Sequence, residues 1–172
     1  MANAYTYQII KDTTQKTIIK LTGEFDGSGQ ESNVSRIQAN TLYGALANDG
    51  TILGSNGSSN VALSFYGTTI TKLNYIVNMG TTGYVKLSWA GSTPATIALL
   101  NRDGQMGEEQ GMSAIPNNAN TPTGDISVST VGAVANASYT IIIELRKDNA
   151  MFDRGQSRDP AAFNYPPYNL RP

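Results

Sequence analysis

Residues 137–147 have the sequence ASYTIIIELRK, in which apolar and polar side chains alternate with a period of two. Such alternation is typical of a β-strand that turns one face to a core and the other to solvent. We therefore predict a strand here, and the rest of the fold is expected to be built around it. The predicted core face consists of Tyr139, Ile141, Ile143 and Leu145.

The alternation stops after Lys147. The sequence that follows, residues 148–172, is DNAMFDRGQSRDPAAFNYPPYNLRP, with prolines at positions 160, 166, 167 and 172. Proline lacks a backbone N–H and favours extended conformations, so this segment is not expected to continue the sheet. We predict two parts for the 172-residue chain: a domain of residues 1–147 and an extended arm of residues 148–172.

Shorter strand patterns precede this strand, separated by turns rich in Gly, Asn and Thr. They cover residues 5–10, 17–22, 34–39, 60–66, 70–79, 84–89, 95–100 and 125–130. The first two are expected to form a hairpin. Residues 60–66 and 70–79 are expected to form a second hairpin through a tight turn at Gly67 and Thr68. The strands within residues 70–100 are expected to form a meander. Strands without alternating helices indicate an all-β fold, an antiparallel β-sandwich or jelly-roll-like domain.

Two regions have no clear strand pattern. Residues 34–46 fit either a strand or a short helix; we favour a strand for residues 34–39 and a single helical turn for residues 42–46. Residues 101–124 form a long stretch without periodicity. Long loops in compact domains are usually functional or lie at interfaces.

The composition excludes several kinds of site. The chain has no cysteine and no histidine, which rules out disulfides, thiolate nucleophiles, His-based metal sites and a Ser-His-Asp triad. The net charge of -1 favours neither nucleic acid nor an anionic membrane as a partner. No export signal or membrane-spanning run is recognisable, so we expect a soluble protein.

Acidic residues in loops are the remaining candidates for catalysis or metal binding. Glu24 and Asp26 flank Phe25, and Glu108 and Glu109 end a glycine-rich stretch that begins at Asp103. Pairs of carboxylates hydrolyse glycosides, and Asp103 to Glu109 has the composition, but not the spacing, of a calcium loop. Because loop acids are mostly solvated, we expect no enzyme, no cofactor and no metal.

Polar and aromatic residues near the strands allow two further interpretations. Residues 80–83, GTTG, lack the lysine of a phosphate-binding loop and are expected to form a hairpin turn. Trp89 shares strand parity with Val85 and Leu87, so we expect it in the core. A carbohydrate-binding sandwich remains an alternative, with Tyr66, Tyr84 and residues 101–124 as its candidate site.

The arm combines aromatic residues, arginines and prolines. Aromatic residues and arginine are enriched at interface hot spots, and proline lowers the entropy lost on docking. We expect the arm to lie on a neighbouring subunit, with folding back over its own domain as the alternative. The predicted interface residues are Phe152, Arg154, Arg158, Phe163, Tyr165, Pro166, Pro167, Tyr168 and Arg171.

Several stretches together resemble a known group of proteins. They are AYTY (4–7), KLTG (20–23), NTLYGAL (40–46), TIIIELRKDNA (140–150), RGQ (154–156) and DPAAFNY (159–165). The chain resembles uncharacterised virion structural proteins of tailed phages, especially marine and cyanobacterial ones. The resemblance implies a particle component assembled in the host cytoplasm, whose partners are other virion proteins and further copies of itself.

Within that setting, the length argues against the major shell subunit. We expect a capsid decoration or cement protein that binds the shell and neighbouring subunits. The alternatives are a neck or tail-terminator component of the head-to-tail region and, from a different class, the carbohydrate-binding sandwich that would recognise a host glycan.

Overall fold

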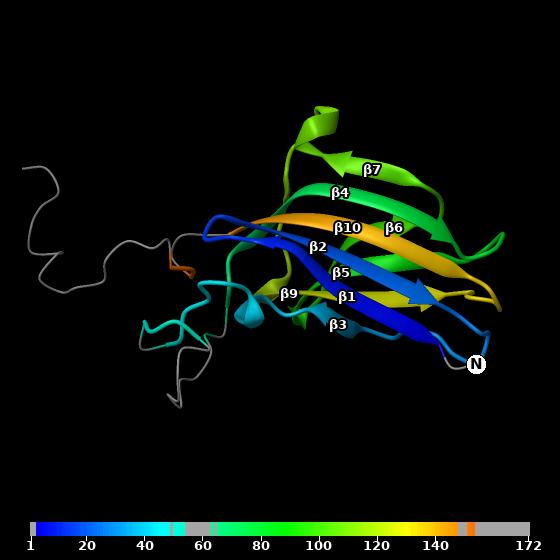
Figure 1. Ribbon diagram of the computed structural model, residues 1–172, viewed down its shortest axis with the longest axis horizontal. Helices are drawn as coiled ribbons and strands as arrows, with labels where there is room; N and C mark the ends of the chain where they lie inside the picture. The colour runs from blue at the N-terminus through cyan, green and yellow to red at the C-terminus, as the bar shows by residue number, and fades with distance from the viewer. Residues whose placement is uncertain (1–2, 49, 54–62, 64, 148–150, 154–172) are drawn as a thin grey trace, which may run out of the picture.

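The protein is an antiparallel β-sandwich, seen in a computed structural model that describes residues 3–48, 50–53, 63, 65–147 and 151–153. Two sheets face one another across a core (Figure 1). The larger sheet contains β1 (Ala4–Asp12), β2 (Lys16–Glu24), β10 (Ser138–Lys147), β4 (Thr68–Asn78) and β7 (Gly104–Gly107) in that order, with β8 (Ile115–Pro116) also paired to β4. The smaller sheet contains β3 (Val34–Ile37), β9 (Asn120–Val131), β5 (Tyr84–Thr93) and β6 (Ala95–Leu100).

The central position of β10 confirms the strongest sequence pattern. This strand pairs with β2 on one side and β4 on the other, and its four predicted core residues are buried. From the opposite sheet, Val85, Leu87 and Trp89 of β5 are fully buried, as their shared parity predicted. The all-β sandwich and the placement of Trp89 in the core are therefore both confirmed.

The order of the strands differs from the predicted meander. β4 pairs with β10, β7 and β8, whereas β5 pairs with β6 and β9 in the other sheet. Residues 80–83 therefore cross between the sheets and are not a hairpin turn. Gly83 is required at this crossing, because a Cβ there would collide with the backbone carbonyl of Met79.

Three local predictions also change. The predicted strand over residues 34–39 is present as β3, but the helical turn is a short 3-10 helix, η1 (Ala39–Thr41), and does not lie at residues 42–46. Thr68 begins β4, so the predicted tight turn at Gly67 and Thr68 is wrong. Residues 101–124 hold β7, a second 3-10 helix, η2 (Glu108–Gln110), β8 and the start of β9, so they are not one long loop.

Candidate functional site

The chain does not leave its own domain at Lys147, where the arm was predicted to begin. The backbone N–H of Leu46 donates to the carbonyl of Met151 at 3.2 Å, and that of Asp153 donates to the carbonyl of Gly44 at 2.7 Å. Gly44 has φ +76°, and a Cβ at this position would lie 2.9 Å from the Asp153 carbonyl oxygen. Residues 151–153 are thus held against residues 44–46.

Phe152 is buried in this contact, and its side chain belongs to the core of its own chain. Its ring packs on that of Tyr66, with centroids 5.6 Å apart. The prediction of an intermolecular interface is therefore wrong for Phe152, where the alternative of folding back holds. The other predicted interface residues lie outside the described residues: Arg154, Arg158, Phe163, Tyr165, Pro166, Pro167, Tyr168 and Arg171.

Lys147, the last residue of β10, is buried in the same region. Its side chain has no exposed surface, and its Nζ donates to the Asp12 carboxylate, to the Thr13 carbonyl at 2.7 Å and to the Tyr43 carbonyl at 2.8 Å. The ammonium group also lies 5.3 Å from the centroid of the Phe152 ring. Burial lowers the pKa of Lys147, against the opposing effect of the hydrogen bond and charge of Asp12.

We call Lys147, Asp12, Thr13, Tyr43 and Phe152 the Lys147 cluster. Its members come from the end of β10, the end of β1 and the turn that follows it, the segment after η1, and the residues that follow β10. A buried ammonium with a carboxylate and two carbonyl acceptors has its charge and all three donors satisfied. Residues 151–153, the last that the structure describes, are therefore held in place beside the Asp12 end of β1.

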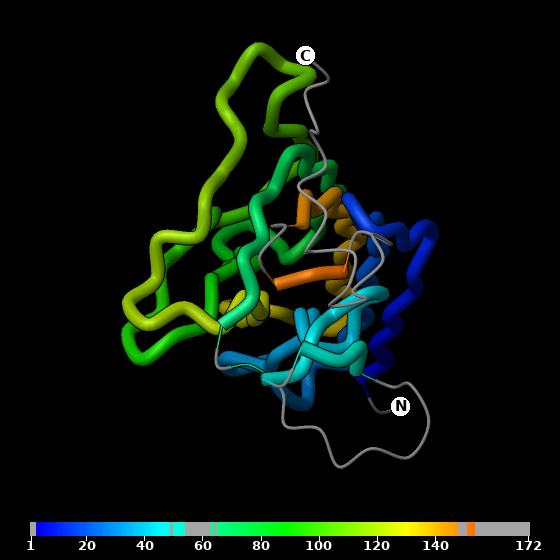
Figure 2. Tube along the Cα trace, turned by 90° about the vertical axis from the view of Figure 1, so that its left-hand side faces the viewer, coloured from blue at the N-terminus to red at the C-terminus, as the bar shows by residue number. Residues whose placement is uncertain are grey.

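Strand β1 offers an open edge next to that point. It is the last strand of the larger sheet and pairs only with β2 among the described residues. Figure 2 shows β1, in dark blue, along one flank of the molecule. Tyr7 and Ile9 are paired with Leu21 and Ile19, which are fully buried, yet they remain 42% and 43% exposed. The core face of β1 is therefore only half covered.

A second buried charge lies near the start of β10 and was missed by the sequence analysis. The Glu31 carboxylate, which is 1% exposed, accepts from Arg36 Nε at 2.6 Å and from the Tyr139 hydroxyl at 2.8 Å. Burial, and then the negative charge of Glu31, raise the pKa of Tyr139. We call Glu31, Arg36 and Tyr139 the Glu31 cluster. Nothing in the Gly/Ser/Gln-rich sequence around Glu31 distinguishes it from a solvated loop acid.

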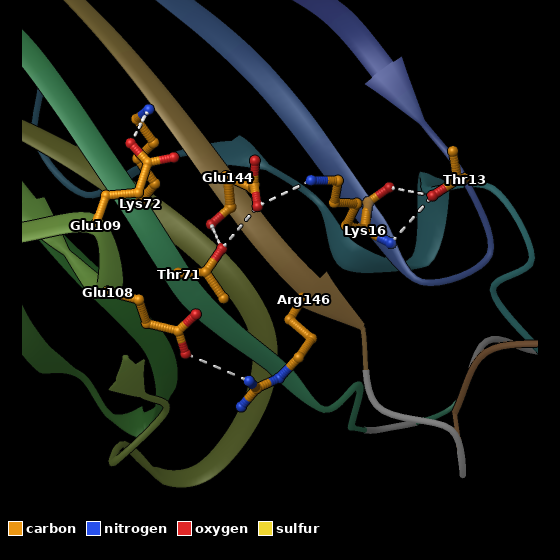
Figure 3. A network of polar contacts seen from close by, with 8 residues as sticks. All are labelled: Thr13, Lys16, Thr71, Lys72, Glu108, Glu109, Glu144 and Arg146. Atoms are coloured by element: carbon orange, nitrogen blue, oxygen red, sulfur yellow. Dashed lines mark hydrogen bonds and ion pairs between the residues drawn. The ribbon is translucent and has the colours of Figure 1, made fainter. Parts of the chain in front are cut away.

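The acids proposed for catalysis near η2 are engaged in ion pairs on the outer face of the larger sheet. Figure 3 shows Glu108 directed at Arg146, 3.5 Å away, and Glu109 directed at Lys72. Glu144 in the same network pairs with Lys16 at 3.2 Å and accepts from Thr71 (Figure 3). Each carboxylate of this network therefore has a cation beside it.

Glu24 and Asp26 lie at the opposite end of the sandwich. Together with Phe25 and Asn136 they line an open depression of about 550 Å³. Hydrogen bonds from Ser28 lower the pKa of Asp26, including one from its backbone N–H at 2.8 Å. A glycosidase acid needs a raised pKa, so Asp26 does not have the environment of that role. No group of three acidic residues that could hold a metal ion occurs in the described part of the chain.

The aromatic residues proposed for glycan binding are not gathered on one surface. Tyr66 is buried, where its hydroxyl donates to the Leu46 carbonyl at 2.7 Å and accepts from the Leu63 backbone at 3.1 Å. Its role is structural, and it is not available to a sugar ring. Tyr84 is half-buried on β5.

Comparison of the chain with protein-family models, with curated proteins and with solved structures gave no match. Across the described ranges, no helix is long and apolar enough to cross a membrane. Two features of the structure are suited to interaction with a partner. They are the fixed position of residues 151–153 and the unpaired edge of β1 close to them.

Proposed function

We propose that this chain is a non-enzymatic structural protein of a tailed-phage particle. In this role it is a decoration protein that sits on the capsid and contacts neighbouring subunits through residues 154–172. The observation that carries the proposal is the Lys147 cluster, a buried and fully bonded set of residues at the exit from the domain. A fixed exit suits a segment whose task is to reach a partner at a defined position.

The physical advantage of such an exit is preorganisation. A segment that starts from a rigid point loses less conformational freedom on binding than one that starts from a mobile loop. Phe163, Tyr165 and Tyr168 then supply apolar contact area, and the arginines supply hydrogen bonds and charge. In a particle, each weak contact is repeated by symmetry, and the repeated contacts add up to high avidity.

The acidic residues support a role without catalysis. Glu108, Glu109 and Glu144 have cations beside them, and the pKa of Asp26 is lowered. Hydrolysis by two carboxylates requires one acid with a raised pKa at a suitable distance from the other. The lowered pKa of Asp26 is the opposite of what the general acid of such a pair requires.

Truncation after Asp153 tests the proposal. The shortened chain keeps Phe152 and the Lys147 cluster, so we expect a folded protein whose buried Trp89 has unchanged fluorescence. Incorporation into particles, measured by quantitative mass spectrometry of purified virions, is expected to be lost. A matched full-length variant with Phe163, Tyr165 and Tyr168 replaced by Ser is expected to behave in the same way. Normal incorporation of both variants would contradict the proposed role of the arm.

The position on the particle separates the decoration protein from a neck or tail-terminator ring. Imaging of particles that carry a label on the chain distinguishes many copies over the shell from a single ring at the portal vertex. Absence of the chain from purified particles would overturn the proposal as a whole.

A further inference from the structure

We propose that residues 161–165 of one copy add as a β-strand to the open edge of β1 in a second copy. The inference rests on the proposed function and deepens it, because it names the surface that receives the arm. Addition of an extended segment to a sheet edge is a general mode of recognition in which backbone hydrogen bonds supply affinity and alternate side chains supply specificity.

The receiving surface is defined by three properties of β1. Its outer edge is unpaired among the described residues, so every second residue directs a backbone N–H and C=O away from the sheet. Its core face leaves Tyr7 and Ile9 about half exposed at 42% and 43%. Its pairing with β2 is regular from Ala4 to Ile9 and is interrupted by a bulge between Ile9 and Lys11. An added strand therefore has five or six regular residues to pair with.

The donor segment matches this length. Residues 161–165, AAFNY, are the longest stretch free of proline between Pro160 and the C-terminal residue, and Pro166 and Pro167 follow directly. Proline cannot donate to a sheet ladder, so strand pairing is confined to about these five residues. In a strand, Ala161, Phe163 and Tyr165 share one face and Ala162 and Asn164 the other.

The chemistry of the side chains indicates which face of the added strand lies on the core side of β1. With Phe163 and Tyr165 on the core side, their rings cover the exposed parts of Tyr7 and Ile9. Asn164 then lies on the outer face, beside the exposed polar residues Thr6 and Gln8. The opposite orientation would leave both rings in solvent and place Asn164 against apolar side chains.

The exit point sets the distance that the arm can cover. Residues 154–160 link Asp153 to the donor segment, and seven extended residues span at most roughly 25 Å. The receiving copy must therefore be in direct contact with the donor. Because arm and edge are different surfaces, passing the arm from copy to copy makes a head-to-tail interface that closes into a ring or extends through a lattice.

Disulfide trapping tests this arrangement. Because the chain has no native cysteine, every disulfide must form between the introduced residues. Chains carrying Thr6→Cys or Gln8→Cys are mixed, at high concentration and under mild oxidation, with chains of different mass that carry Asn164→Cys. Opposite residues on paired strands lie within disulfide range, so one of the two mixtures is expected to give a covalent heterodimer. Thr96→Cys, on the exposed edge strand β6 of the other sheet, is the control and is expected to give none.

A second measurement uses charge. Ile9→Arg places a cation on the receiving face and is expected to weaken association, measured by analytical ultracentrifugation, by about tenfold or more. Leu99→Arg, at an exposed position of β6, is expected to leave it unchanged.

Three outcomes overturn the inference. Cross-linking only within a single chain of the Gln8→Cys/Asn164→Cys variant would mean that the arm covers its own edge. Dimers of Gln8→Cys chains alone would mean that two β1 edges pair with each other, and absence of any cross-link would place the arm elsewhere. In each case the proposed function is judged separately, by the incorporation of the chain truncated after Asp153 into particles.

Discussion

The Glu31 cluster and the Lys147 cluster each place a charged side chain in the core beside one end of β10, but they connect different amounts of chain. Glu31 is paired with Arg36, five residues away, and with the Tyr139 hydroxyl of β10. Lys147 is bonded to three residues more than 100 positions away, Asp12, Thr13 and Tyr43, and contacts Phe152. The first cluster joins one short segment, residues 31–36, to β10, whereas the second joins four separate segments.

The partners also differ in their access to solvent. The Arg36 side chain in the Glu31 cluster is 24% exposed and lies 4.2 Å above the ring of Tyr5, so part of its charge is hydrated. The Lys147 side chain is completely buried. A buried charge that loses its partner costs far more free energy than one that reaches water. Loss of a charged partner is therefore expected to destabilise the protein more in the Lys147 cluster than in the Glu31 cluster.

The largest expected effect comes from removing Phe152. Deletion of residues 148–172 takes away its ring, which packs on Tyr66 and Lys147 in the core, whereas deletion of residues 154–172 leaves it in place. Loss of a buried Phe side chain costs about 3–5 kcal/mol. Urea denaturation followed by Trp89 fluorescence is expected to show this loss for the longer deletion and almost none for the shorter. Equal stabilities would mean that Phe152 contributes nothing to the domain.

The next effect compares the two buried ion pairs directly. Asp12→Asn leaves the Lys147 ammonium without its counter-ion and is expected to lower the free energy of unfolding by about 3 kcal/mol. Glu31→Gln leaves Arg36 partly hydrated and keeps one acceptor for Tyr139, so about 1–2 kcal/mol is expected. Both variants are measured by the same denaturation experiment. The reverse order would show that the Glu31 cluster is the stronger support.

Strand β10 illustrates how much of this arrangement the sequence predicts. Its alternation is strictly local information, and it correctly places Tyr139, Ile141, Ile143 and Leu145 in the core. The same parity continues to Lys147, so the pattern contained a signal for a buried lysine. That signal alone does not predict burial, because lysine is rarely buried without a partner. The partner, Asp12, lies 135 residues earlier in the sequence.

Partner choice between strands was not predictable in the same way. β4 lies next to β10 and β7, and β5 lies in the other sheet, although residues 70–100 read as a simple meander. Period-two alternation fixes which face of a strand is buried, but it does not specify the neighbouring strand. Glu31 was missed for a related reason, because its burial depends on Tyr139, a residue 108 positions away.

Alkaline pH is expected to weaken the Glu31 end. The pKa of Tyr139 is raised in the folded protein, first by burial and then by the charge of Glu31. Above the ordinary tyrosine pKa of about 10, the unfolded chain therefore releases a proton that the folded chain retains, and stability falls by up to about 1.4 kcal/mol per pH unit. Tyr139→Phe removes this contribution, so its stability is expected to fall less steeply than that of the wild type. Parallel curves for the two proteins would contradict the assignment.

The smallest effect has the opposite sign and belongs to the Lys147 end. Burial lowers the pKa of Lys147, so between that lowered value and the ordinary lysine pKa of about 10.4 the unfolded chain binds more protons than the folded one. The contribution of Lys147 to stability therefore rises with pH across this window. Lys147→Arg keeps its charge throughout and is expected to lack the rise. The difference in unfolding free energy between wild type and Lys147→Arg should grow, in favour of the wild type, as the pH rises toward the ordinary lysine pKa of about 10.4. A constant difference would mean that Lys147 stays protonated in its buried site, held there by Asp12 and the two carbonyl groups.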